Sequence, residues 1–228
     1  MENTQPEGKK SSRQGMLALA IIVLVLVIDQ IIKILVKTNM SLGESIDITS
    51  WFKILFVENN GMAFGMEIMG KLFLSIFRII AIAFFIWYLF KIVNKGFPKG
   101  YIITVAFVIA GATGNLIDCM FYGLMFSESM YGPDGVSVIM PLGDGYAPFL
   151  YGKVVDMFYF PLWTWPDWVP FIGGDIFFGP VFNFADACIT CGVLALLLFY
   201  TRYVNMGLRY HEPEEPETTQ TTGVDEEE

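Results

Sequence analysis

The chain has 228 residues, of which 54% are hydrophobic and only 16% are charged, and its mean hydropathy is +0.54. A soluble domain of this length carries more charge, so the composition excludes an ordinary water-soluble enzyme and favours an integral membrane protein. The net charge of −9 comes mostly from an acidic segment that begins at Glu212 and ends in Asp225 and three glutamates. Because such a segment cannot bury apolar surface, residues 205–228 are predicted to form a disordered cytoplasmic tail.

Four apolar stretches are long enough to cross a bilayer, which takes roughly 20 residues. They cover residues 16–36, 72–93, 101–122 and 182–204. The first contains Asp29 and Lys33 and has no small-residue cleavage site after it, so it is predicted to be a retained helix and not a signal peptide. Residues 1–15 would then be a cytoplasmic N-terminus, and residues 16–204 a single four-helix membrane domain.

The basic residues in the short flanks predict the orientation, because cytoplasmic loops carry the excess of Lys and Arg. Eight of them fall on one side if both termini are cytoplasmic: Lys9, Lys10, Arg13, Lys91, Lys95, Lys99, Arg202 and Arg209. The loops 38–71 and 123–181 then lie outside.

The two outer loops have different compositions. Residues 48–57 are β-branched and aromatic, which predicts a strand or small sheet. The loop 123–181 is rich in Gly, Pro and aromatic residues, and its Trp and Phe cluster is most simply an anchor at the water–lipid interface. The predicted fold class is therefore a mainly α membrane protein. It has four transmembrane helices, a small extracytoplasmic β-sheet or cradle and a long outer loop insertion.

Polar residues inside spans are costly, so each is a candidate for the functional site. Asp29 and Lys33 lie in the outer half of the first span, four residues apart on one helix face, where they can form a structural ion pair. Asn115 and Asp118 come roughly 21–26 Å along the third span at 1.5 Å per residue, near its outer end. The first, third and fourth spans therefore bring polar groups to the same outer level, and the fourth span contributes two of these residues.

That contribution is Asn183 and Asp186, in the first turn of the fourth span. Asp156 joins them from a short strand-like run, residues 153–158, in the outer loop. Asn115 and Asn183 are expected to hydrogen-bond neighbouring helices or carboxylates. Arg78, in the second span, is either a functional charge or a partner of one of these carboxylates.

The available side chains restrict the chemistry. The only His is His211 in the tail, so no Ser-His-Asp or Cys-His set is possible. Cys188 and Cys191 are three residues apart, but without a second pair they are expected to be packing residues, and no metal or other cofactor is predicted. Two carboxylates that share a proton can hydrolyse amides by activating water and polarising the carbonyl.

Five blocks of the sequence resemble the motifs of bacterial lipoprotein signal peptidase, also called signal peptidase II. They are DQIIK at 29–33, NNGMAF at 59–64, GATGNLID at 111–118, VVDMF at 154–158 and FNFAD at 182–186. They occur in the family's order, and the resemblance covers the chain from about Met16 to Val204.

The resemblance implies an aspartic membrane peptidase of the bacterial inner membrane with its active site at the outer face. It would cut prolipoproteins on the amino side of a diacylglyceryl-modified cysteine. Its partners would be these substrates and membrane lipid, with no nucleic acid, and globomycin would inhibit it. The catalytic dyad carries over to Asp156 and Asp186. The supporting and substrate-binding residues carry over to Asp29, Lys33, Asn59, Gly61, Asn115, Asp118 and Asn183.

The sequence departs from the family pattern where Cys119 follows Asp118 in place of the usual Arg. Either Lys153 or Arg78 is the candidate to supply the missing cation. The loop is also long, with Asp118 and Asp156 38 residues apart and a Pro-rich aromatic excess between Asp156 and Asp186.

Two other functions fit parts of the pattern. A small ion- or proton-coupled transporter would also contain intramembrane Asp, Asn and Lys, but its site would be expected near the midplane. A non-catalytic scaffold that binds partners through the outer loops would leave the convergence of Asp156 and Asp186 unexplained.

Overall fold

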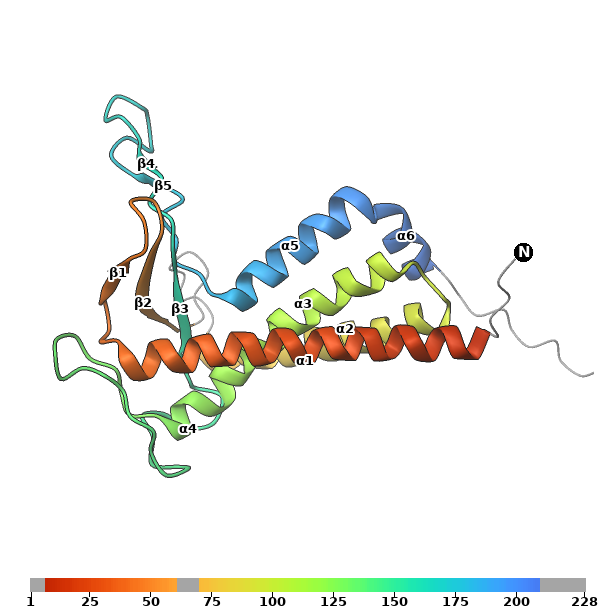
Figure 1. The fold of residues 1–228 in the computed structure, drawn as a ribbon, viewed down its shortest axis with the longest axis horizontal. Helices are drawn as coiled ribbons and strands as arrows, with labels where there is room; N and C mark the ends of the chain where they lie inside the picture. The colour runs from red at the N-terminus through yellow and green to blue at the C-terminus, as the bar shows by residue number, and fades with distance from the viewer. Residues whose placement is uncertain (1–6, 61–69, 210–228) are drawn as a thin grey trace, which may run out of the picture.

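The computed structural model describes residues 7–60 and 70–209, in which a helix bundle carries a small sheet at one end (Figure 1). Helix α1 covers Glu7–Asn39, α2 covers Lys71–Asn94 and α3 covers Lys99–Ile117. Within the described ranges, three helical segments are long and apolar enough to cross a membrane, and a fourth span is obtained if one bent pair of helices is counted. The predicted class of a mainly α membrane protein with a small sheet is confirmed.

The bent pair differs from the straight helix predicted over 182–204. Helix α5, Phe184–Phe199, is followed by α6, Thr201–Arg209, at an angle of 88°. The helix turns where its apolar run ends, because the rings of Tyr200 and Tyr203 pack on Tyr101 with centroids 5.5 and 5.9 Å away. The 16 residues of α5 rise only about 24 Å.

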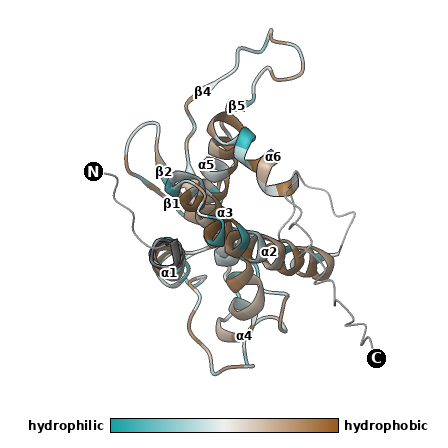
Figure 2. Ribbon diagram, turned by 90° about the vertical axis from the view of Figure 1, so that its right-hand side faces the viewer, coloured by the Kyte–Doolittle hydropathy of each residue, from teal (hydrophilic) through white to brown (hydrophobic). Residues whose placement is uncertain are grey.

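Helix α3 is the most buried helix and packs against α1, α2 and α5. Small residues permit this position, because a side chain at Gly111 would collide with the Ala185 carbonyl oxygen, 2.3 Å from the added Cβ. Many apolar side chains of α1, α2 and α5 remain exposed on the outside of the bundle, where Figure 2 shows predominantly hydrophobic helices. That surface suits contact with lipid.

The sheet has the antiparallel order β1-β2-β3, formed by Ser45–Asp47, Lys53–Asn59 and Val154–Tyr159. It sits at the end of the bundle opposite α6 and the start of α1 (Figure 1). The predicted strand at 48–57 is displaced, because residues 48–52 form a turn in which Thr49 Oγ1 accepts main-chain hydrogen bonds from Trp51 and Phe52. The prediction of a small sheet in this loop is confirmed, although its third strand comes from the second outer loop.

The sheet is tied to the helices by a buried apolar cluster: Val36, Met40, Phe56, Tyr122, Phe126, Val155 and Met157. Helix α3 continues through a π-helical turn, η1, Asp118–Tyr122, into the short α4, Gly123–Met125. A second, two-stranded sheet pairs β4, Trp163–Thr164, with β5, Ile176–Phe177. The predictions for residues 1–6, Gly61 and the tail beyond 209 lie outside the described residues.

Candidate active site

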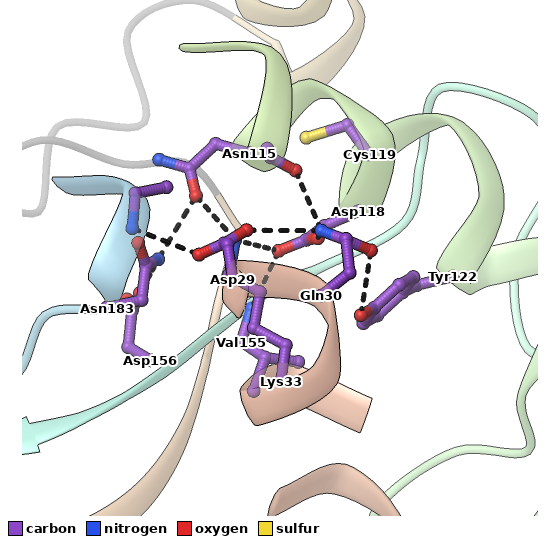
Figure 3. A network of polar contacts seen from close by, with 12 residues as sticks. Asp29, Gln30, Lys33, Asn115, Asp118, Cys119, Tyr122, Val155, Asp156 and Asn183 are labelled. Atoms are coloured by element: carbon purple, nitrogen blue, oxygen red, sulfur yellow. Dashed lines mark hydrogen bonds and ion pairs between the residues drawn. The ribbon is translucent and has the colours of Figure 1, made fainter. Parts of the chain in front are cut away.

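The predicted polar residues of α1, α3, β3 and α5 converge in one network at the sheet end of the bundle (Figure 3). They come from positions as far apart in sequence as Asp29 and Asp186. Of the nine residues predicted for the site, Gly61 is the one outside the described ranges. The sequence therefore identified groups that the fold brings together.

Lys33 is the centre of the network and is completely buried. Its Nζ lies 3.0 Å from Asp29 Oδ2 and 2.8 Å from Asp118 Oδ2, and it donates a hydrogen bond to Asn115 Oδ1 at 2.8 Å. The ion pair predicted between Asp29 and Lys33 is thus present, with Asp118 as a second anion. One cation between two carboxylates leaves a net negative charge here.

The two asparagines connect Lys33 to the two proposed catalytic carboxylates. Asn183 Nδ2 donates to Asp156 Oδ1 at 2.6 Å and to Asn115 Oδ1 at 3.1 Å. Asn115 Nδ2 donates to Asp186 Oδ1 at 2.7 Å. Each amide therefore accepts from one side and donates to a carboxylate on the other, which fixes its orientation.

Asp186 occupies its place because it belongs to the N-terminal cap of α5. Asn183 is the N-cap and accepts a hydrogen bond from the Asp186 N–H at 2.9 Å, while Asp186 Oδ2 accepts from the Asn183 N–H at 3.3 Å. This capping box holds a carboxylate in the first helical turn, where the helix dipole stabilises negative charge. Asp186 is only half-buried, so water can reach it.

Asp156 has a drier environment, on strand β3 opposite Val57. Burial, and after it the negative charge of Asp186, raise the pKa of Asp156 to about 7, while hydrogen bonds from Asn183 and Asn59 act in the opposite direction. Asn59 thus joins the site from the end of β2. A proton on Asp156 beside a charged Asp186 is the arrangement that a carboxylate dyad needs.

The π-helical turn is a feature that the sequence analysis missed. It begins at Asp118, whose Oδ1 accepts from Gln30 Nε2 at 2.9 Å and whose Oδ2 accepts from the Val155 N–H at 3.4 Å. Asp118 thereby attaches strand β3, which carries Asp156, to α1 and α3. Wider turns of this type are frequent at functional sites, but no residue pattern in 118–122 distinguishes them from an ordinary helix.

A second buried charge cluster was also missed. Lys37 Nζ lies 2.5 Å from Glu58 Oε1 and donates to Ser129 at 2.9 Å, and Lys153 pairs with Glu58 and Glu128 at 3.2 Å each. The spacing could have indicated this cluster, because Lys37 follows Lys33 by four residues and therefore lies on the same helix face. This cluster attaches the outer loop to β2 next to Asn59.

Cys119 stands where the family pattern has Arg, and the guanidinium of another helix lies beside it. Arg78 of α2 donates from Nη1 to Cys119 Sγ at 3.1 Å. Within residues 7–60 and 70–209, Arg78 forms no ion pair with a carboxylate, so the alternative pairing considered for it is wrong. Of the two candidate cations, Arg78 contacts Cys119, whereas Lys153 pairs with Glu58 and Glu128.

Fold and site together place several carboxylates at one end of a bundle of apolar, membrane-type helices (Figure 3). A family model described as signal peptidase (SPase) II matches residues 21–202. A lipoprotein signal peptidase of Porphyromonas gingivalis is 50% identical over 198 residues, covering 85% of this chain and 86% of the relative. Another, of Amoebophilus asiaticus, is 35% identical over 188 residues, covering 78% and 75%.

The chain therefore belongs to the signal peptidase II family, the aspartic peptidases that remove signal peptides from prolipoproteins. Two solved structures described as bacterial membrane enzymes share its fold. One has a TM-score of 0.54 at 21% identity and covers 87% of this chain and 94% of its own. The other has a TM-score of 0.53 at 24% identity, with 79% and 90% covered. The predicted resemblance to this family is confirmed, and the transporter and scaffold interpretations are wrong.

Proposed function

We propose that the chain hydrolyses the bond on the amino side of a diacylglyceryl-modified cysteine, with Asp156 and Asp186 as the catalytic dyad. The observation that carries this proposal is the pair of amides, Asn115 and Asn183, each of which donates to one carboxylate. Asn115 also accepts hydrogen bonds from Asn183 and from Lys33. This arrangement supports a buried, protonated Asp156 next to an accessible, ionised Asp186.

The proposed reaction needs only water and the two carboxylates. Asp186 takes a proton from water while the resulting hydroxide attacks the scissile carbonyl carbon, and Asp156 donates its proton to the carbonyl oxygen. The tetrahedral intermediate then collapses: the C–N bond breaks, Asp186 gives its proton to the leaving amine, and the proton on the former carbonyl oxygen returns to Asp156. Products are a carboxylic acid and an amine, and the dyad ends in its starting state.

The remaining site residues are positioning residues in this scheme. Lys33 holds Asn115. Asp29 accepts from the Ala185 N–H at the start of α5, and Asp118 accepts from the Val155 N–H at the start of β3. Asn59 supports Asp156 from β2. Gly61 is proposed as a support from its motif.

For the topology, we propose a bacterial inner-membrane protein with both termini cytoplasmic and the dyad at the outer face. The start of α1 and helix α6 lie at one end of the bundle and the site at the other (Figure 1), which supports this orientation together with the basic flanks. The signal peptide's helix and the acyl chains would approach from lipid, while water reaches Asp186 from outside.

The substrate assay is direct. Purified protein should cleave a diacylglyceryl-modified precursor, leave the unlipidated form of the same precursor intact, and be blocked by globomycin. Equal cleavage of both forms would contradict the lipid requirement, and full activity in saturating globomycin would contradict the proposed inhibitor.

The pH profile should report the proton on Asp156. Because its pKa is raised to about 7 and the active form is protonated, kcat/KM should fall roughly tenfold per pH unit above that pKa. The measurement is kcat/KM from pH 5 to 9 on the lipidated precursor, with a sample held at the highest pH and assayed near neutrality to exclude denaturation. A rate that stays constant up to the highest pH is incompatible with a protonated Asp156.

Arg78 is proposed to supply the cation that relatives carry after the Asp118 position. Arg78→Ala should lower kcat/KM by about tenfold, the loss of one charge-assisted contact of ~1.5 kcal/mol, and adding Cys119→Arg should restore most of it. Cys119→Ala should retain activity, because the guanidinium remains. Lys91→Ala, at the other end of α2, is the matched control. If Arg78→Ala cleaves at the normal rate, the assignment is wrong.

A further inference from the structure

We propose that residues 160–178, here called the aromatic arm, rest on the lipid surface of the outer leaflet beside α5. The arm connects β3, which carries Asp156, to the segment that leads into α5, which carries Asp186. A membrane contact at this point would hold both elements of the dyad at the level of the interface. The proposal uses the outer position proposed for the site, and its test requires no turnover.

The position of the arm supports lipid as its partner. Strands β4 and β5 lie at the same end of the bundle as the three-stranded sheet, and the arm runs across the direction of α1 (Figure 1). Viewed along the bundle, it projects sideways beyond α5 (Figure 2). An arm that left the membrane would continue the helix direction. This one instead overhangs the area next to α5, where lipid headgroups lie if α5 spans the membrane.

The arm is held together by ring stacking and main-chain hydrogen bonds. Trp163 stacks on Phe177 with ring centroids 3.9 Å apart, and main-chain hydrogen bonds join Trp165 to Asp175 and Gly174. Its base is attached by Phe160, which stacks on Phe52 and on Phe182 at 4.7 and 5.7 Å. The arm therefore transmits its position to Phe182, directly before Asn183 of the site.

The tip of the arm carries strongly exposed aromatic side chains. Trp168 is 80% exposed and Phe171 is fully exposed. Phe171 also has φ = 68°, in the left-handed region that a bulky residue rarely adopts. This backbone presents the Phe171 ring to solvent, and burial of the ring in an outside contact would offset the cost of the left-handed conformation. Trp and Phe are the side chains that favour the membrane–water interface.

The charge of the arm indicates which kind of lipid surface it can contact. Between Phe160 and Phe182 the ionisable residues are Asp167 and Asp175, with no Lys or Arg. Attraction to anionic headgroups cannot hold such an arm, so contact must come from apolar and aromatic groups and be insensitive to salt. A zwitterionic lipid surface fits this chemistry.

The test uses the tryptophans of the arm as depth probes. In a Trp51→Phe, Trp87→Phe background, the three remaining tryptophans all lie in the arm. The protein is placed in phosphatidylcholine nanodiscs whose acyl chains are brominated either near the headgroup or near the terminal methyl. Bromine near the headgroup should quench emission by about twofold, and bromine at the chain end much less, as expected for interfacial residues. High salt should leave the quenching unchanged.

Two variants distinguish a lipid contact from other outcomes. Phe171→Ser with Ile172→Ser in the arm should reduce the quenching and shift the emission to the red. Tyr131→Ser with Leu142→Ser, two strongly exposed apolar residues of the outer loop that lie outside the arm, should leave both the quenching and the emission wavelength unchanged. Emission that is the same in brominated and ordinary nanodiscs would overturn the proposal and indicate water or a protein partner around the arm.

Discussion

Asp156→Asn and Asp186→Asn should each reduce cleavage of the lipidated precursor by about 10³-fold or more, with the folded structure retained. Asparagine has nearly the shape of aspartate and keeps one acceptor oxygen for the hydrogen bond from Asn183 or Asn115. At position 186 the second acceptor, which the Asn183 N–H uses, is lost, at the cost of one weak cap contact. What is lost is the proton on Asp156 or the basic carboxylate of Asp186, and proton transfer of this kind contributes about 10²–10⁴-fold.

The two losses should not add. Because the carboxylates act as one unit, the double variant should be about as inactive as either single variant. Asp144→Asn, in the exposed part of the outer loop, is the matched control and should cleave normally. Single-turnover rates and the thermal unfolding midpoint should be measured on the same samples. A folded single variant with near-normal turnover would remove that residue from the dyad.

Lys33→Met should destabilise the protein more than any other single change in the network. It leaves Asp29 and Asp118 buried without their cation, and breaking a buried ion pair from one side costs about 3–5 kcal/mol. The unfolding midpoint in detergent should fall steeply and activity should disappear. Lys53→Met, which breaks an exposed pair with Asp47, should cost at most ~1 kcal/mol.

A triple variant can show whether the lost stability comes from unpaired buried charge or from changed packing. Lys33→Met combined with Asp29→Asn and Asp118→Asn removes all three charges and should recover most of the lost stability, because no unpaired ion remains. Activity should stay low, since Asn115 then loses its donor. If the triple variant unfolds as readily as Lys33→Met alone, charge burial is not the cause.

The positions of the spans and the depth of most polar groups were predictable from the sequence. Hydropathy along the chain is local, and the constant rise of a helix converts residue number into depth. This placed Asp29, Lys33, Asn115 and Asp118 at one level, and Asp186 with them. Asp156 could be assigned because its strand-like run lies in an outer loop and matches a family motif.

The contacts between segments could not be predicted in this way. The π-helical turn at Asp118, the Lys37–Glu58 cluster, and the bend between α5 and α6 depend on how distant elements pack. The guanidinium of Arg78 next to Cys119 depends on the rotation of α2 against α3. Apart from the four-residue spacing of Lys33 and Lys37, these features leave no periodic signal in their own segments.

The sequence by itself determined a multi-span membrane protein, its family and the common level of most of its polar residues along the helices, because these follow from local hydrophobicity, short motifs and helix pitch. The tertiary structure alone decided which side chains meet: the asparagines between Lys33 and the dyad, and the dry surroundings that raise the pKa of Asp156. It also decided the sideways course of the aromatic arm. Burial, rotation and side-chain reach are properties of the packed chain, and they are set by long-range contacts that no single segment encodes.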